Sequence, residues 1–284
     1  MNVSQTYHHL RQQLVDTPGL ADEATAITRL LFEHYLHYSL TDIAIRGDFD
    51  VPEAIAEIMQ EALNRIAQGE PVQYVIGSET FHGLRFKVTP ATLIPRPETE
   101  QLVDIIIDRH KHQRGLRVLD VGTGSGCIAI ALARSLDWAE VDAIDFSADA
   151  LAVAKENAKT LKVNVNFIHA DILKAHPEDF EKYDIIVSNP PYVTMSEKAQ
   201  MLPNVLEHEP HSALFVPDSD PLLFYRAITR FAAKTLHEGG SLYFETNTAF
   251  TTQVAQLMTA EGFTDAETHR DAFTHPRFAI AKKG

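Results

Sequence analysis

Between residues 116 and 245, short apolar runs alternate with segments of helical periodicity. Five runs have the length and composition of buried strands: 116–122, 140–145, 165–171, 183–189 and 240–245. Helical patterns cover 127–136, 147–161 and about 221–236, and a further one at 249–260 precedes two more strand-like segments, "FTDAETHR" and "RFAIAKK". Strands that alternate with helices form a mostly parallel sheet covered on both faces. We therefore predict an α/β, Rossmann-like fold with a seven-stranded sheet.

The first 70 residues have a different pattern and predict a small helical bundle. Apolar residues recur there at spacings of three and four: Ile27, Leu30, Leu31, Tyr35, Ile55, Ile58, Met59, Leu63 and Ile66. Residues 71–97 follow with alternating polarity and glycine turn signals, which predicts a β-hairpin connector. Pro97 and two acidic residues then begin a helix that runs to about residue 109. The α/β domain is expected over residues 98–284.

Composition and charge make several classes of function less favoured. The chain has one cysteine, Cys127, which suits a reducing cytosol and is expected in the core. No signal peptide or membrane-length apolar segment is visible, so we predict a cytoplasmic protein without a membrane partner. The net charge of −14, with 4 basic against 11 acidic residues in the first 75, argues against direct nucleic-acid binding. No set of residues has metal-ligand spacing.

The glycine-rich segment "VLDVGTGSGCIAIALA" (118–133) forms a strand-to-helix turn. Gly122, Gly124 and Gly126 permit positive φ and let a ligand approach the backbone closely. The spacing G-x-G-x-G differs from a dinucleotide fingerprint, and no P-loop lysine follows. Asp120 would disfavour a pyrophosphate but suits a ligand that carries an ammonium group.

Acidic residues also end the next two strands. Asp145 closes the second strand, where an acid typically accepts hydrogen bonds from ribose hydroxyls, and Asp171 closes the third, where an acid can meet an adenine amine. Ligands of open α/β sheets bind at these carboxyl ends. Together the residues describe a nucleoside with an amino-acid tail and no phosphate, which is S-adenosylmethionine. The domain is thus similar to class I S-adenosylmethionine-dependent methyltransferases.

The fourth strand ends in "SNPPYV" (188–193), where two consecutive prolines stop the strand. The side-chain oxygen of Asn189 and the carbonyl of Pro190 can both accept hydrogen bonds from a planar NH₂ group. The prolines stiffen the turn, and Tyr192 can pack on a planar amide or base. Such a turn predicts transfer of a methyl group to an amide or adenine nitrogen.

The flanking segments favour one family. "GEPVQYVIGSETFHGLRF", "LIPRPETEQLVD", "VLDVGTGSGCIAIALA" and "VSNPPYV", in this order after a helical region, resemble the PrmC (HemK) family of release factor glutamine methyltransferases. The resemblance implies methylation of the glutamine in the Gly-Gly-Gln motif of class-1 peptide chain release factors, docking of the factor on the helical domain, and a monomer. It implies cofactor contacts by Asp120, Gly122, Thr123, Gly124, Ser125, Gly126, Asp145, Asp171, Ile172 and Asn189. It implies substrate contacts by Asn189, Pro190, Pro191 and Tyr192, with Arg96, Pro97, Glu98, Thr99 and Glu100 near the mouth of the site; Asn189, Pro190 and Tyr192 are the expected catalytic set.

Two features qualify the resemblance. Asp271 and Arg277 match the family's late Asp-to-Arg spacing, whereas Thr246 and Asn247 follow Glu245 in place of the usual residues. Two alternatives stay open: a ribosomal-protein glutamine methyltransferase, which shares the "LIPRPETE" segment, and an adenine methyltransferase of DNA or RNA.

Overall fold

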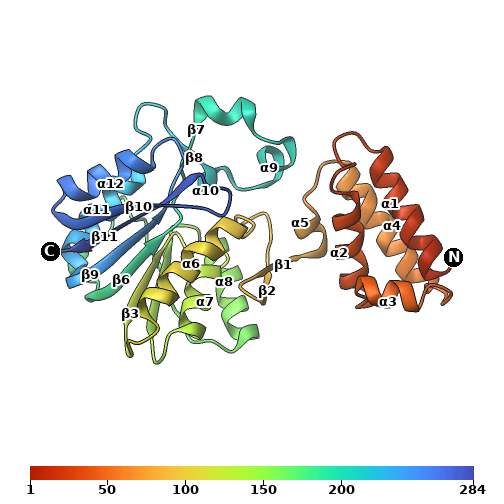
Figure 1. Cartoon of the computed structure of the whole chain (residues 1–284), viewed down its shortest axis with the longest axis horizontal. Helices are drawn as coiled ribbons and strands as arrows, with labels where there is room; N and C mark the ends of the chain where they lie inside the picture. The colour runs from red at the N-terminus through yellow and green to blue at the C-terminus, as the bar shows by residue number, and fades with distance from the viewer. The chain divides into compact units, whose positions relative to one another are not determined.

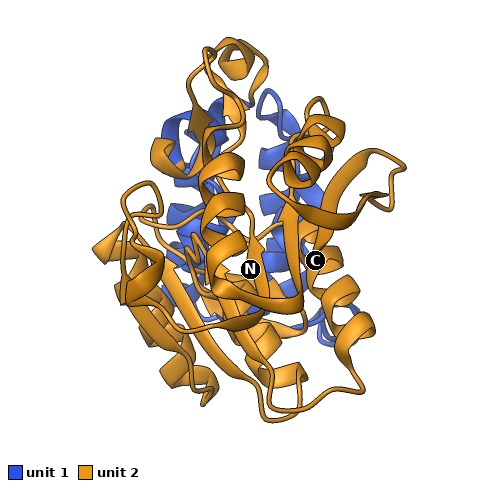
Figure 2. Ribbon diagram, turned by 90° about the vertical axis from the view of Figure 1, so that its left-hand side faces the viewer, with its two compact units in different colours: residues 1–77, 202–208 blue, residues 78–201, 209–284 orange.

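The computed structural model describes residues 1–284, which group into two compact units (Figures 1 and 2). The helical unit comprises Met1–Gly77 together with Leu202–His208, and the α/β unit comprises Ser78–Met201 and Glu209–Gly284. None of the helices is both long and apolar enough to cross a bilayer.

The helical unit has its own apolar core, as the spacing of its apolar residues predicts. Its helices are α1 (Val3–Asp16), α2 (Ala24–Leu36), α3 (Leu40–Ile45), α4 (Glu53–Ala67), α5 (Val72–Ile76) and the late segment α9 (Pro203–His208). Leu14, Leu31 and Met59 are fully buried. Ile58 is an exception to the predicted core positions, because its side chain is 47% exposed.

The hairpin is shorter than the sequence pattern suggested. Val72–Ile76 form helix α5, and only β1 (Ser78–Phe81) and β2 (Leu84–Lys87) pair as an antiparallel hairpin. Val72 and Val75 pack into the core of the helical unit, and Gly77 ends the helix in a left-handed conformation. Burial of these valines therefore overrides the local strand-like alternation.

A seven-stranded mixed sheet forms the centre of the α/β unit, with the strand order β10-β11-β9-β6-β3-β4-β5. The strands are β3 (Arg117–Val121), β4 (Glu140–Asp145), β5 (Asn166–His169), β6 (Tyr183–Ser188), β9 (Leu236–Glu245), β10 (Phe263–Arg270) and β11 (Pro276–Lys283). β9, β6, β3, β4 and β5 run parallel, whereas β11 is antiparallel to both neighbours. The predicted mostly parallel sheet is confirmed.

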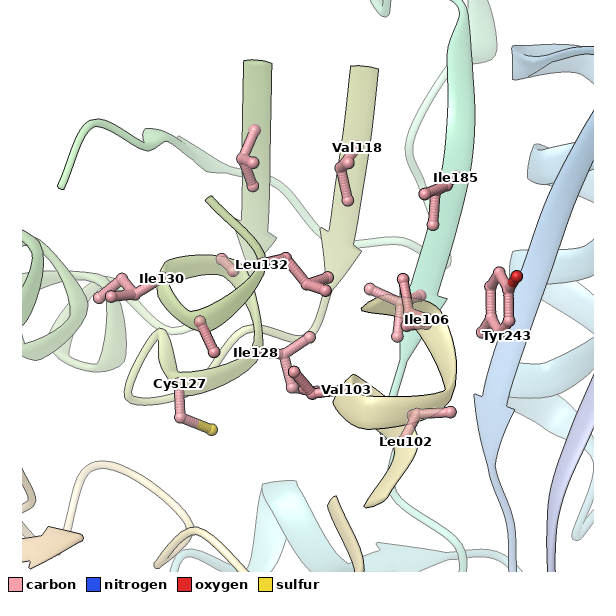
Figure 3. Close-up of a cluster of buried hydrophobic side chains, with 14 of the residues drawn as sticks. Leu102, Val103, Ile106, Val118, Cys127, Ile128, Ile130, Leu132, Ile185 and Tyr243 are labelled. Atoms are coloured by element: carbon pink, nitrogen blue, oxygen red, sulfur yellow. The ribbon is translucent and has the colours of Figure 1, made fainter. Parts of the chain in front are cut away.

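Alternate residues of the strands face two helical layers. Val118 and Ile185 point into the cluster with α6 (Pro97–His110), α7 (Cys127–Ser135) and α8 (Ala148–Leu161), part of which Figure 3 shows. Leu119 and Ile186 point into the opposite cluster, with α11 (Leu223–Thr235) and α12 (Thr251–Ala260). Both faces of the sheet are buried, which explains the nearly continuous apolar strands.

Short elements join the sheet strands. They are η1 (Pro177–Asp179), β7 (Val193–Thr194), η2 (Met195–Gln200), α10 (His211–Leu214) and β8 (Phe215–Val216). β7 and β8 pair in parallel, so the chain that leaves the "SNPPYV" turn is pinned beside the segment that follows α10.

Candidate active site

A cavity of about 1020 Å³, including the space at its open mouth, lies at the carboxyl ends of β3, β4 and β6. The glycine turn, the end of β4 and the residues after β5 and β6 line it, together with the segment around α10 and six residues before and in α6: Ala91, Thr92, Leu93, Pro95, Arg96 and Thr99. The predicted site residues that line the cavity are Arg96, Gly122, Thr123, Gly124, Ser125, Asp145, Asp171, Ile172, Asn189, Pro190 and Pro191. The lining includes Thr99, another residue predicted near the mouth.

The glycine turn holds its shape through the backbone of β4. The N–H groups of Gly122 and Thr123 both donate to the carbonyl of Ile144, at 2.9 and 3.0 Å. Gly126 begins α7 with φ of +82°, and a Cβ there would lie 3.1 Å from Ala154 and Ile130 side-chain atoms. Gly126 therefore packs under the turn against α8, while the preceding residues border the cavity.

Asp120 lies beneath the turn instead of along the cavity. Its Oδ2 accepts hydrogen bonds from the Thr123 hydroxyl at 2.6 Å and from the Ala129 N–H at 3.2 Å. The side chain is wholly buried and Oδ1 has no hydrogen-bond partner. Burial raises the pKa of Asp120 to about 7. The carboxyl thus braces the turn and the start of α7.

The two later acids occupy different environments at the cavity wall. Asp145 is buried, and its carboxylate accepts the N–H groups of Gly124 and Ser147, each at 2.9 Å; burial raises its pKa. Asp171 is more exposed and bonds Lys174 at 2.8 Å, which lowers its pKa. Asp145 therefore fixes the glycine turn to the end of β4, while Asp171 places a negative charge on the cavity wall.

The "SNPPYV" turn is anchored at both ends. The Ser188 hydroxyl donates to the carbonyl of Val121 at 2.6 Å, which ties the end of β6 to β3. Asn189 Nδ2 donates to Thr99 Oγ1 at 3.2 Å, and the Tyr192 hydroxyl donates to Glu245 Oε1 at 3.3 Å. Tyr192 does not line the cavity, because its ring packs toward the core that β9 shares with α11.

Glu245 ends β9 behind this turn with 1% of its surface exposed. Its Oε2 accepts the hydroxyl of Thr99 at 2.7 Å. Burial raises the pKa of Glu245, while the Thr99 hydrogen bond and the charge of Arg277 oppose that rise. One carboxyl group therefore meets the hydroxyls of Thr99, in α6, and Tyr192, after β6.

A second buried acid, Glu209, contacts a residue of the cavity wall. Glu209 pairs with Arg96 and accepts the backbone N–H of Ile94 at 3.2 Å. Sequence reasoning missed this residue, because an acid between two histidines in "LEHEPHSAL" has no distinguishing local pattern. Phe146 was also missed: it follows Asp145, lines the cavity and is 54% exposed.

Six residues predicted for the site or its mouth do not border the cavity: Asp120, Gly126, Tyr192, Pro97, Glu98 and Glu100. The first two support the glycine turn from below, and Tyr192 contacts Glu245. Cys127 joins the predicted core and also borders the cavity.

The residues that depart from the family pattern hold the loop after the turn. Asn247 Nδ2 donates to the Tyr192 carbonyl at 3.2 Å and to Glu197 at 3.1 Å. Thr246 is buried; its hydroxyl donates to the carbonyl of Arg277 at 3.0 Å and forms a hydrogen bond with the hydroxyl of Thr251 at 2.7 Å. Asp271 and Arg277, predicted from their spacing, form an ion pair at 3.5 Å.

Known proteins resemble this chain in sequence and in fold. Residues 5–77 match the PrmC N-terminal domain, and residues 99–214 match the methyltransferase small domain. A release factor glutamine methyltransferase from Bacteroides thetaiotaomicron is 40% identical over 97% of this chain and 98% of its own length. Another, from Flavobacterium psychrophilum, is 41% identical over 87% of this chain and 88% of its own. A 16S rRNA methyltransferase from T. thermophilus, solved with AdoMet and guanosine, shares the fold at a TM-score of 0.54, with 21% identity over 73% of this chain and 50% of its own.

The seven-stranded sheet, its antiparallel β10–β11 end and the glycine turn at the cavity define a class I methyltransferase. Sequence identity of 40–41% with two curated relatives, over 97% and 87% of this chain, identifies the family within this class of methyltransferases. The chain belongs to the release factor glutamine methyltransferase family.

Proposed function

We propose that this protein transfers a methyl group from S-adenosylmethionine to the side-chain amide nitrogen of a glutamine in a peptide chain release factor. The position of Asn189 carries the proposal, because it lines the same cavity as the glycine turn and Asp145. The finer assignment, the glutamine of the Gly-Gly-Gln motif, follows from the likeness of this chain to the family. Relatives named for this activity support the substrate class.

The residues along the cavity fit the cofactor. Asp145 offers a carboxylate at the end of β4 for ribose hydroxyls, and Asp171 and Ile172 border the same wall after β5. The glycine turn lets a ligand approach its backbone, and the unpartnered Oδ1 of Asp120 lies beneath that turn. When bound, S-adenosylmethionine supplies an electrophilic methyl group. Thr123, Ser125 and Asn189, which line the cavity, complete the proposed contacts, whereas Gly126 supports the turn from below.

The turn after β6 would orient the acceptor amide. The Asn189 side-chain oxygen and the Pro190 carbonyl can each accept one hydrogen of a glutamine NH₂ group. An amide nitrogen is a weak nucleophile, so its alignment matters more than its activation by a base; positioning of this kind contributes up to roughly 7–11 kcal/mol. The nitrogen loses its proton to water during or after transfer.

Pro191, Tyr192, Arg96 and Glu98 are the further substrate-side residues in this proposal. Pro191 and Arg96 border the cavity, so they are the first of the four to meet a glutamine-bearing loop. The helical unit would dock the release factor. The protein would act as a monomer and without a nucleic-acid partner. Its excess of acidic residues is consistent with a protein partner.

A comparison of three candidate substrates in separate reactions tests the proposal. The protein and labelled S-adenosylmethionine are incubated with an unmethylated release factor, a ribosomal protein substrate of glutamine methylation, or a DNA duplex rich in adenine. The proposal predicts label only on the release factor. Label on the ribosomal protein or the duplex, with none on the release factor, would move this chain to another substrate class.

A further inference from the structure

We propose that Thr99 and Glu245 are positioning residues that fix the direction of the Asn189 carboxamide. This inference rests on the proposed function, in which the Asn189 side-chain oxygen accepts a hydrogen from the substrate amide. Neither residue needs to touch the transferred methyl group: Glu245 lies outside the cavity lining, and Thr99 acts through the Asn189 side chain.

The hydrogen-bond directions form a chain of three groups. A carboxylate has no hydrogen to donate, so Glu245 Oε2 accepts the single hydroxyl hydrogen of Thr99 at 2.7 Å. The oxygen of Thr99 is then left with acceptor capacity only, which Asn189 Nδ2 fills at 3.2 Å. The opposite orientation would place Asn189 Oδ1 against an oxygen whose hydrogen is already used. The chain thus keeps Oδ1 as the end of the amide that can accept from a substrate.

Glu245 acts on the other side of the turn as well. Its Oε1 accepts the hydroxyl of Tyr192 at 3.3 Å, while its Oε2 is linked to Asn189 through Thr99, so one carboxylate connects to the first residue of Asn189–Tyr192 indirectly and to the last directly. Tyr225 adds a hydrogen bond from its hydroxyl to the backbone carbonyl of Glu245 at 3.3 Å. The carboxylate lies at the end of β9, a buried central strand. Its hydrogen bonds to Thr99 and Tyr192 therefore restrain the turn.

The burial of Glu245 supports a role beyond packing. A carboxylate with 1% exposure costs folding free energy unless hydrogen bonds compensate it. The donors come from α6 and from the turn after β6, which lie far apart in the chain. A buried charge that joins two such elements beside a cavity is typical of a group that orients functional side chains.

Substitutions at Thr99 separate orientation from packing. Thr99→Val keeps the shape of the side chain and removes the hydroxyl, whereas Thr99→Ser keeps the hydroxyl and removes a methyl group. We expect Thr99→Val to lower kcat for release factor methylation about 10- to 100-fold, because a misdirected acceptor loses alignment in the reacting state. KM for the release factor and the Kd for S-adenosylmethionine, measured by calorimetry, should change less than about threefold. Thr99→Ser should stay within about threefold of the wild-type kcat.

Thr235→Val is the matched control. Thr235 is equally buried, and its hydroxyl bonds the Phe231 carbonyl within α11, remote from the turn. This variant should lose some thermal stability and keep the wild-type kcat. It shows what loss of a buried hydroxyl does by itself.

Glu245→Gln provides a second, independent variant. An amide has an acceptor at one end only, so it cannot accept from both Thr99 and Tyr192, and we expect a lower kcat with little change in cofactor Kd. An unchanged kcat in Thr99→Val, a loss in Thr99→Ser as large as in Thr99→Val, or a parallel loss of cofactor binding would each overturn the inference. If the wild-type protein does not methylate the release factor at all, the proposed function itself fails instead.

Discussion

Among single residues, Asp120 at the end of β3 is the fully buried acid beneath the glycine turn. Its carboxyl is fully buried, and burial raises its pKa to about 7 from an ordinary value near 4. The folded protein therefore holds this proton over a pH range in which the unfolded chain has released it. Stability should respond to pH with a definite sign.

The linkage relation gives that sign. Between about pH 4 and pH 7 the folded state binds more protons at Asp120, so the free energy of unfolding falls as pH rises, and it levels off above pH 7. The Asp120→Asn variant lacks this contribution to the pH dependence of the free energy of unfolding, because an amide does not titrate. The wild type should lose stability relative to Asp120→Asn between pH 5 and pH 7, on the order of 1 kcal/mol per pH unit. Urea unfolding of both proteins at several pH values measures it; a constant difference between them would refute a raised pKa.

Several residues of the site could be predicted from the sequence. Asn189, Asp145 and the glycine turn were predicted from residue type and position at strand ends, and all of them line one cavity. The roles of Thr99 and Glu245 depend on contacts between α6, β6 and β9. Such contacts leave no local pattern, so the sequence could indicate the turn but not the residues that hold it.

At the element scale, the passage from β3 into α7 depends on Gly126. An added Cβ would meet Ala154 and Ile130 at 3.1 Å, and φ of +82° disfavours any side chain. We expect Gly126→Ala to destabilise the fold by about 1–3 kcal/mol through crowding, beyond the cost of the backbone conformation. It should also weaken binding of S-adenosylmethionine, because the turn shifts with α7.

Gly115→Ala is the control for that prediction. Gly115 has φ of +66° but no neighbour within 4 Å of the added Cβ, so only the backbone cost applies, about 1–2 kcal/mol. Thermal unfolding and calorimetry compare the two variants. Equal losses in both would show that crowding against α8 is unimportant.

The segment after α9 depends on the buried acid Glu209. Glu209→Ala removes the acceptor of the Ile94 N–H and the partner of Arg96, and an unsatisfied buried donor costs about 1–3 kcal/mol. We expect a stability loss of that order together with a raised KM for the release factor, because Arg96 borders the cavity.

Glu156→Ala tests whether any lost ion pair would have the same effect. Glu156 pairs with Lys87 at 2.7 Å, but both side chains are about half exposed, so the expected change is below about 1 kcal/mol. Denaturant unfolding and steady-state kinetics distinguish the variants. If both acids prove equally dispensable, the Arg96–Glu209 pair does not shape the mouth of the cavity.

The bounds of the strands could be predicted more readily from the sequence than the compact unit to which each segment belongs. The strands β3, β4, β6 and β10 lie within a residue or two of their predicted ends, since each is a buried apolar run or a clear alternation. Val72–Ile76 was wrongly predicted as part of the hairpin, because tertiary burial decided its conformation. The membership of Leu202–His208 in the helical unit has no signal in the sequence either, since it depends on contacts with residues far away in the chain.

The whole molecule combines a class I methyltransferase domain with a helical unit that has its own apolar core. The central claim is that the turn at Asn189 orients the glutamine amide of a release factor. The acceptor geometry depends on the folded turn, and the affinity for a whole factor would come from a larger surface than one side chain offers. An isolated Gly-Gly-Gln peptide should therefore be a much poorer substrate than the folded factor.

Peptide mass spectrometry of an unmethylated release factor, after incubation with the protein and S-adenosylmethionine, tests this claim most directly. We expect the wild type to add one methyl group to the Gly-Gly-Gln glutamine. We expect Asn189→Ala to do so at a rate at least about 100-fold lower, while cofactor binding is largely retained. A methyl group on another residue, or an Asn189→Ala variant that methylates the same glutamine at the wild-type rate, would contradict this role of Asn189.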